Sequence, residues 1–196
     1  MLTSAAAERN KGPILDVLRR VLPPAGTVLE IASGSGQHAV FFAAALPPLR
    51  FLPSDRDAES LASIRTYAAA AHLANVADPV LLDVTHEPWP VARADAIVAI
   101  NMVHISPWEA TLALVSGAAR RLERGAPLVL YGPYRVGGRH TAPSNEAFDE
   151  SLRARDPRWG VRDVEAVLEA ASRAGLEEAE RVAMPANNLT LVLRRV

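Results

Sequence analysis

The sequence contains no cysteine, which excludes disulfides, thiolate metal sites and a thiol nucleophile. Lys11 is the only lysine, so nearly all the basic charge comes from arginines scattered along the chain. Aromatic residues make up 5% of the sequence, and the formal net charge is −1. A near-neutral chain without a basic cluster offers no electrostatic basis for binding nucleic acid, and we expect none to bind.

Several features that other protein classes need are also missing. The least polar runs, Ala39–Leu46 and Ala96–Ile105, are too short to cross a bilayer. The N-terminal end lacks the apolar segment of a secretory signal, so we expect a cytoplasmic protein without membrane association. His38, His72 and His86 lack the grouped partners that a metal site needs, and we expect no metal. The absence of a G-x-S-x-G segment argues against a hydrolase.

What the chain does have is an alternation of strand and helix patterns over 196 residues, of which 49% are hydrophobic. Strands are expected near 28–31, 50–53, 79–82, 94–100, 127–131, 178–184 and 189–195, and helices near 13–22, 37–45, 58–71, 107–122, 146–155 and 161–174. This order predicts a single α/β domain over residues 1–196 with a doubly wound, mostly parallel, Rossmann-like sheet. Residues 1–12 are expected to form an N-terminal arm, and Gly132–Asn145 a glycine-rich loop.

The most informative stretch is Thr27–Phe42, in which an apolar strand breaks at Gly34 and Gly36 and resumes as a helix. Such a turn places backbone N–H groups where a ligand can approach closely. Glu30 stands just before the turn, and a carboxylate there suits a ligand with an ammonium, hydroxyls or a sulfonium better than a pyrophosphate. The sign of this charge points to S-adenosylmethionine (SAM) as the cofactor.

Acidic residues also follow the second and third strands. Asp55 lies nineteen residues after Gly36, where an acid in a β-α-β unit accepts the hydroxyls of an adenosine ribose. Asp83, at the end of the third strand, is placed to receive the adenine amino group. Ligands of such sheets bind beyond the carboxyl ends of the strands, which is where all these residues are expected.

Two other interpretations of the glycine turn stay open. The glycines can serve only the close packing of strand on helix. Alternatively, Gly34-x-Gly36-x-x-Ala39 formally satisfies the G-x-G-x-x-G/A pattern of a nucleotide-dependent oxidoreductase. Glu30, the short chain and the closing pair of strands argue against a dinucleotide.

Glu30-Ile-Ala-Ser-Gly-Ser-Gly36 resembles the first motif of class I SAM-dependent methyltransferases. Further segments resemble one branch of that superfamily, the uncharacterised group of methyltransferase-like protein 26 and its bacterial relatives, also called domain of unknown function 938. These segments are Ala7–Pro13, Asn101–Trp108, Tyr131–Arg135, Pro143–Asn145 and Met184–Leu189. The resemblance spans almost the whole chain and identifies a fold and a cofactor class rather than a substrate.

The resemblance implies a seven-stranded sheet with an antiparallel last strand and SAM lying over the glycine turn. It implies that Glu30, Gly34 and Gly36 contact the methionine part, Asp55 the ribose and Asp83 the adenine; Ala32 and Asn101 complete the expected cofactor-binding set. The chain departs from the superfamily at Ala32, where glycine is usual, and a methyl group there narrows the approach of the cofactor.

A second group of polar residues is expected on the same rim or in the loop above it: Asn101, His104, Tyr134, Arg135, Arg139, His140, Asn145, Asn187 and Asn188. His104, Asn101 and Tyr134 are the catalytic candidates, with His104 as the base if the acceptor needs one. Each has a simpler alternative. His104 can pack or cap the helix that follows it, Tyr134 and Arg135 can brace the loop, and Asn187 and Asn188 suit a turn.

These features together predict a SAM-dependent methyltransferase acting on a small molecule or a protein group. The alternative is a non-catalytic module that has the methyltransferase fold and binds SAM or nothing. It is motivated by the lack of a recognisable catalytic motif, such as N/D-P-P-Y, after the fourth strand, where the chain has Asn101-Met-Val-His104 instead. The sequence does not identify the acceptor or the oligomeric state.

Overall fold

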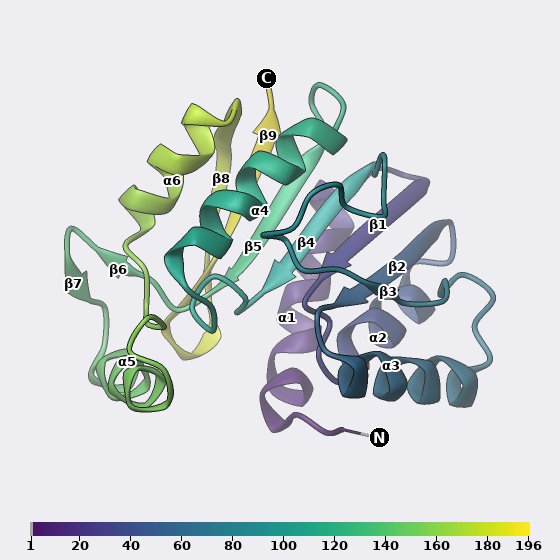
Figure 1. Cartoon of the computed structure of the whole chain (residues 1–196), viewed down its shortest axis with the longest axis horizontal. Helices are drawn as coiled ribbons and strands as arrows, with labels where there is room; N and C mark the ends of the chain where they lie inside the picture. Colours follow the sequence, from purple (N-terminus) through teal and green to yellow (C-terminus); the bar gives the residue numbers. More distant parts are fainter. Residues whose placement is uncertain (1) are drawn as a thin grey trace.

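A seven-stranded sheet runs through the centre of the computed structural model, which describes residues 2–196. Its strands in chain order are β1 (Gly26–Ile31), β2 (Leu49–Asp55), β3 (Val80–Leu81), β4 (Ala96–Ile100), β5 (Pro127–Gly132), β8 (Leu176–Met184) and β9 (Asn188–Arg195). In space their order is β3-β2-β1-β4-β5-β9-β8. β9 alone runs opposite to the other strands of this sheet, and Figure 1 shows its arrow opposed to those of β4 and β5. The doubly wound sheet with an antiparallel last strand is confirmed.

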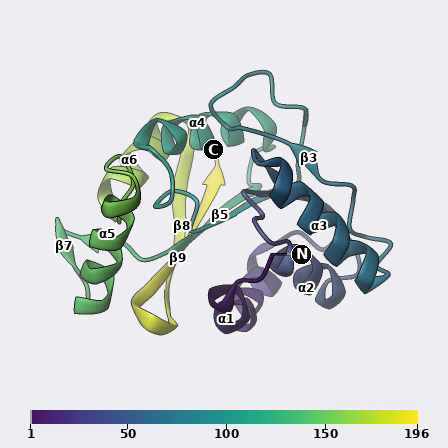
Figure 2. The ribbon, with the colours of Figure 1, turned by 60° about the horizontal axis from the view of Figure 1, so that its bottom comes forward.

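Helices cover both faces of this sheet. The helices are α1 (Ala5–Val21), α2 (Gln37–Ala45), α3 (Ala58–Ala71), α4 (Trp108–Arg121), α5 (Pro143–Arg155) and α6 (Val164–Arg173), with a short 3₁₀ turn at Pro185–Asn187; of these, α5 lies beyond the edge of the sheet (Figure 1). Figure 2 shows α1, α2 and α3 on one side and α4 and α6 on the other. Successive strand residues alternate between these layers: Val28 packs in the cluster with α1 and α2, whereas Leu29 and Ile31 pack in the cluster with α4 and α6.

The N-terminal segment departs from the expectation of an arm over residues 1–12, of which Met1 lies outside the described residues. Helix α1 begins at Ala5, with Ser4 as its N-cap, and continues through Pro13. Proline inside a helix removes one backbone hydrogen bond. Contacts with α2 offset this loss, because the Gln37 side chain accepts from the Ser4 N–H at 2.6 Å and donates to Glu8 at 2.7 Å. Tertiary contacts of this kind leave no periodic signal in the sequence.

The segment expected to be a loop, Gly132–Asn145, contains a small hairpin of β6 (Arg135–Val136) and β7 (Arg139–His140). Its two turn residues, Gly137 and Gly138, have φ of 58° and 76°. Two consecutive left-handed residues are the mark of a tight two-residue hairpin turn, which glycine adopts without steric cost. Helix α5 then begins at Pro143, before the expected start at residue 146.

None of the helices over residues 2–196 combines the length and apolarity needed to cross a membrane. Within the same residues, no three histidine, aspartate or glutamate side chains converge as ligands of a metal would.

Candidate functional site

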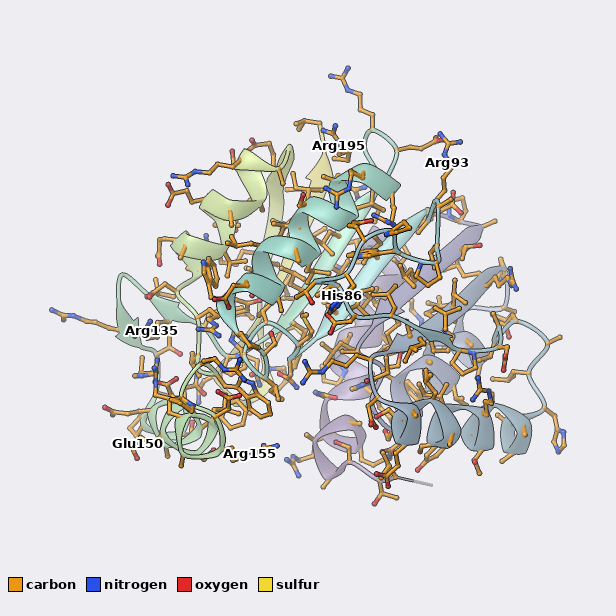
Figure 3. All side chains as sticks on the ribbon, viewed as in Figure 1. His86, Arg93, Arg135, Glu150, Arg155 and Arg195 are labelled. Carbon is orange, nitrogen blue, oxygen red and sulfur yellow. The ribbon has the colours of Figure 1, made fainter. Side chains whose placement is uncertain are left out.

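Cavities lie along the edge of the sheet where the parallel strands end, and two of them border the turn after β4. One of these two, the β1–β4 cleft, has a volume of about 570 Å³, and its walls include Ala32, Asp55, Asp83, Met102 and Trp159. The second, the α1–β5 cavity, has a volume of about 450 Å³. Figure 3 shows Arg135, Glu150 and Arg155 where the hairpin and α5 flank this edge, whereas Arg195 marks the opposite edge.

The glycine turn between β1 and α2 contains three residues with left-handed backbone: Ala32, Gly34 and Gly36, with φ of 55°, 55° and 91°. A Cβ at Gly36 would lie 2.8 Å from the Cα of Ile64, so this glycine lets α2 and α3 pack closely. A Cβ at Gly34 would meet no described atom within 4 Å, so this part of the turn faces open space. The two glycines therefore differ: Gly36 is required for close packing, whereas the position of Gly34 is open.

Glu30 lies directly behind the turn and is 2% exposed. Its Oε2 atom has no hydrogen-bond partner among the described residues. Burial raises the pKa of Glu30 to about 7; a hydrogen bond with Ser33 opposes the rise, and the nearby charge of Asp55 adds to it. A buried carboxylate with one unpartnered oxygen is costly unless a positive group arrives to pair with it.

Asp55 and Asp83, both expected at the carboxyl ends of their strands, lie at the wall of the β1–β4 cleft. Asp55 accepts from the backbone N–H groups of Gly34 at 2.9 Å and Asp57 at 3.1 Å, so part of its hydrogen-bonding capacity holds the turn. Asp83 accepts from the N–H and hydroxyl of Thr85. Burial opposes ionisation of Asp83, but these two bonds outweigh it and lower its pKa. Asp83 is therefore an anion at the rim of the cleft.

Asn101 follows β4 in a left-handed conformation, with φ of 59°. Its neighbours Ile100 and Met102 line the β1–β4 cleft, whereas Asn101 itself lines the α1–β5 cavity. The backbone holds this turn firmly, because the Asn101 N–H donates to Tyr131 at 2.7 Å and its carbonyl accepts from His104 at 3.1 Å. The turn after β4 therefore separates the two cavities and borders both.

His104 and Tyr134, two of the three catalytic candidates, lie in the interior with no exposed surface. Their rings pack edge to face at 4.7 Å. His104 Nδ1 accepts from the Arg162 N–H at 3.2 Å, and the His104 carbonyl accepts from Gly160 at 2.9 Å. Burial, helped by the charge of Arg162, lowers the pKa of His104 to about 3, and burial raises the pKa of Tyr134 well above its usual range. These contacts fit the packing role that the sequence also allowed.

Some of the remaining polar candidates lie in or near the hairpin, and the others lie at the α1–β5 cavity. Arg135 forms an ion pair with Asp163 at 2.7 Å, and Arg139 is exposed in the hairpin. His140 Nε2 lies 3.6 Å from Asp149. Arg135 and His140 thus tie the hairpin to Asp163 and to α5. The asparagines Asn145, Asn187 and Asn188 come together at the α1–β5 cavity, where Asn145 donates to the Asn187 carbonyl at 2.8 Å, and Asn145 and Asn188 line the wall.

Trp159 is a wall residue of the β1–β4 cleft that the sequence did not indicate. It lies in the segment between α5 and α6, which is anchored beneath the cleft by Arg162. The Arg162 guanidinium donates to the carbonyls of Val103 at 3.0 Å and Ser106 at 2.6 Å. His104 fixes the same segment through its contacts with Gly160 and Arg162, so His104 acts on the cleft only through the position of its wall.

Replacement of His104 by asparagine, whose Oδ1 can replace Nδ1 as an acceptor, should make the protein less sensitive to acid. The folded-state pKa of His104 is about 3, below the ordinary value of 6.5, so its neutral form stabilises the fold above pH 6.5 and this stability is lost as the pH falls. When the pH falls from 7.5 to 5, the wild type should lose about 2 kcal/mol more unfolding free energy than His104→Asn loses. Urea unfolding at both pH values measures this change. His72→Asn, at an exposed helix end, is the control and should show no such change.

Comparison with known proteins places the chain in a structural context. The model of the family DUF938, described as a protein of unknown function, matches residues 1–195. Similar solved structures include the mitomycin 7-O-methyltransferase MmcR, at 16% identity and a TM-score of 0.84, with 98% of this chain and 55% of that chain covered. CalO1, a methyltransferase in calicheamicin biosynthesis solved with SAH bound, has 19% identity and a TM-score of 0.77, with 96% and 54% covered.

An O-methyltransferase family 2 protein from Planctomyces limnophilus, in complex with apigenin, has 18% identity and a TM-score of 0.81, with 97% of this chain and 60% of that chain covered. The chain thus spans little more than half the length of these structures. At such identities the likeness establishes a shared fold, and the polar residues of the two cavities are what remain to indicate an activity.

Proposed function

Because the chain belongs to the DUF938 family of proteins of unknown function, its activity must be inferred from its site, and we propose that it is a SAM-dependent methyltransferase. The observation that carries this proposal is the unpartnered, buried oxygen of Glu30 behind a turn that faces open space at Gly34. An ammonium group of a ligand at this turn would supply the missing counter-charge.

The residues that line the β1–β4 cleft fit the rest of the cofactor. In this proposal Asp55 and Asp83 accept from the ribose and the adenine amino group, and the apolar residues Ile31, Leu82 and Met102 enclose the adenine ring. Asn101 borders the methionine part. When bound, SAM supplies a methyl group activated by a positively charged sulfur. CalO1, which has the same fold, is described with SAH bound, and this likeness supports the assignment.

The chain's own contribution to catalysis would be positioning and the exclusion of water. The turn after β4 is fixed by backbone hydrogen bonds and borders both cavities, so it can set the position of the acceptor relative to the cofactor. Trp159 closes one wall of the cleft. His104 and Tyr134 have no base role here, because their buried rings pack against each other and His104 Nδ1 already accepts from the Arg162 N–H. A small molecule that fits the α1–β5 cavity is the proposed acceptor.

Calorimetry with SAM tests the proposal through Asp55→Ala and a matched control. Like Asp55, Asp95 accepts a hydrogen bond from a backbone N–H group. Its donor is Thr27 in β1, at 2.6 Å, at the opposite edge of the sheet. Both variants lose a backbone cap, whereas only Asp55→Ala should weaken SAM binding, by at least about tenfold for a lost interaction of about 1.4 kcal/mol. Equal losses in both variants would show that Asp55 acts only as a brace, and no binding of SAM or SAH by the wild type would refute the proposal.

A further inference from the structure

The α1–β5 cavity is a second built site, separate from the cleft proposed for the cofactor. Each of the five segments that carry the family resemblance contributes to its wall. Its lining residues include Arg9, Asn10, Asn101, Tyr131, Asn145 and Phe148. Asn145 and Tyr131 are each 4% exposed, so their positions are set by packing. Because Asn101 lies between two residues of the β1–β4 cleft, a molecule in this cavity lies across the β4 turn from a molecule in the cleft.

The charged and proton-accepting groups in the wall of the α1–β5 cavity limit the ligands that it can bind. Among the described lining residues, Arg9 is the only charged side chain, and no carboxylate or imidazole reaches the cavity. His38 contacts the wall only by pairing its Nε2 with Asn10 at 2.7 Å, and its burial lowers its pKa to about 4, so it carries no charge at neutral pH. The wall therefore has a cation to attract an anion and lacks a group that takes a proton from an acceptor.

From this wall we infer that the cavity binds a small organic carboxylate and that the carboxylate oxygen is the methyl acceptor. A carboxylate is already deprotonated at neutral pH, so it needs no base. It is the charge complement of Arg9, and the apolar surfaces of Phe148 and the nearby prolines suit its organic part. Acceptors that are cationic, or that must first lose a proton, suit this wall less well.

The transfer balances without a further reactant, and it rests on the proposed methyltransferase function. A carboxylate oxygen forms a bond to the methyl carbon while the bond from that carbon to the sulfonium sulfur breaks, and the bonding electron pair stays with sulfur. The products are a methyl ester and the neutral thioether, and no proton is exchanged.

Binding can be measured without activity. Phenylacetate and its uncharged isostere phenylacetamide serve as probes, in calorimetric titrations of the full chain up to about 10 mM. Phenylacetate should bind at least about tenfold more tightly than the amide. Arg9→Gln should remove this preference, whereas Arg19→Gln, which changes an exposed arginine of the same helix that does not line the cavity, should keep it. Circular dichroism checks that both variants are folded.

The product distinguishes failure of this inference from failure of the proposed function. With SAM present, a carboxylic acid acceptor should yield a methyl ester that releases methanol in base, whereas a methyl ether or a methylamine would not. If phenylacetate binds but SAM does not, the cavity assignment stands and the methyltransferase proposal fails. If SAM binds while the acid and the amide bind equally, or neither binds, the carboxylate assignment is overturned and the proposed function is untouched.

Discussion

Glu30→Gln is expected to stabilise the ligand-free protein by about 3 kcal/mol at pH 8. The folded-state pKa of Glu30 is about 7, raised above the ordinary 4.5 chiefly by burial. An acid with a raised pKa in the folded state costs nothing while it is protonated in both states, below about pH 4.5. The cost grows between pH 4.5 and 7 and is complete above pH 7, because the folded protein must then hold a buried charge with one unpartnered oxygen.

The pH dependence is what identifies this cause. At pH 5 the advantage of the glutamine variant should shrink to about 1 kcal/mol or less, because most of the folded wild type keeps its proton there. Urea unfolding at pH 5 and pH 8 gives the comparison. Glu59→Gln, at an exposed position in the first turn of α3, is the control and should show little difference between the two pH values. A glutamine variant less stable than the wild type at pH 8 would show that the ionised carboxylate braces the fold.

The same substitution should have the opposite effect on the cofactor, if the proposed function holds. A ligand ammonium pairs only with the ionised form of Glu30, so SAM affinity should rise from pH 6 to pH 8 in the wild type. Glu30→Gln should bind SAM at least about tenfold more weakly at pH 8 and lose this dependence. A variant that is more stable but binds its ligand less well would place Glu30 among residues whose unfavourable burial is retained for function.

The parts of this molecule that were predictable from sequence are those governed by local pattern. Continuous apolar strands followed at once by polar residues located the sheet edge, and this is why Asp55 and Asp83 lie at the same cleft. The left-handed turn after β1 was signalled by its glycines. The glycines did not reveal that Ala32 also adopts the left-handed conformation, at an exposed position.

The side chains whose roles depend on tertiary packing were not predictable. His104 follows a strand end as a catalytic histidine would, yet the segment around Arg162 covers it, and that segment lies 58 residues further along the chain. Arg9 and Asn10 belong to a stretch expected to be an arm, and they reach the α1–β5 cavity only because α1 begins at Ala5. No local signal reports which residues a distant segment will cover or bring together.

The two glycines of the turn give the clearest separation of packing from ligand binding. Gly36→Ala should lower the unfolding free energy by about 3 kcal/mol, since it combines left-handed strain with overpacking. The new Cβ would stand 2.8 Å from backbone of α3, which has little room to move. Gly34→Ala adds a methyl group that meets no described atom within 4 Å, so its cost in stability should be only about 1 kcal/mol.

For ligand binding the order should reverse. The methyl group of Gly34→Ala projects into the space that the cofactor is proposed to occupy, and it should weaken SAM binding at least about tenfold in a protein that remains well folded. The fraction of Gly36→Ala that remains folded at low temperature should bind SAM with an affinity closer to that of the wild type. If Gly34→Ala binds SAM as tightly as the wild type, the open face of the turn is not where the ligand lies, and both glycines serve only to pack strand against helix.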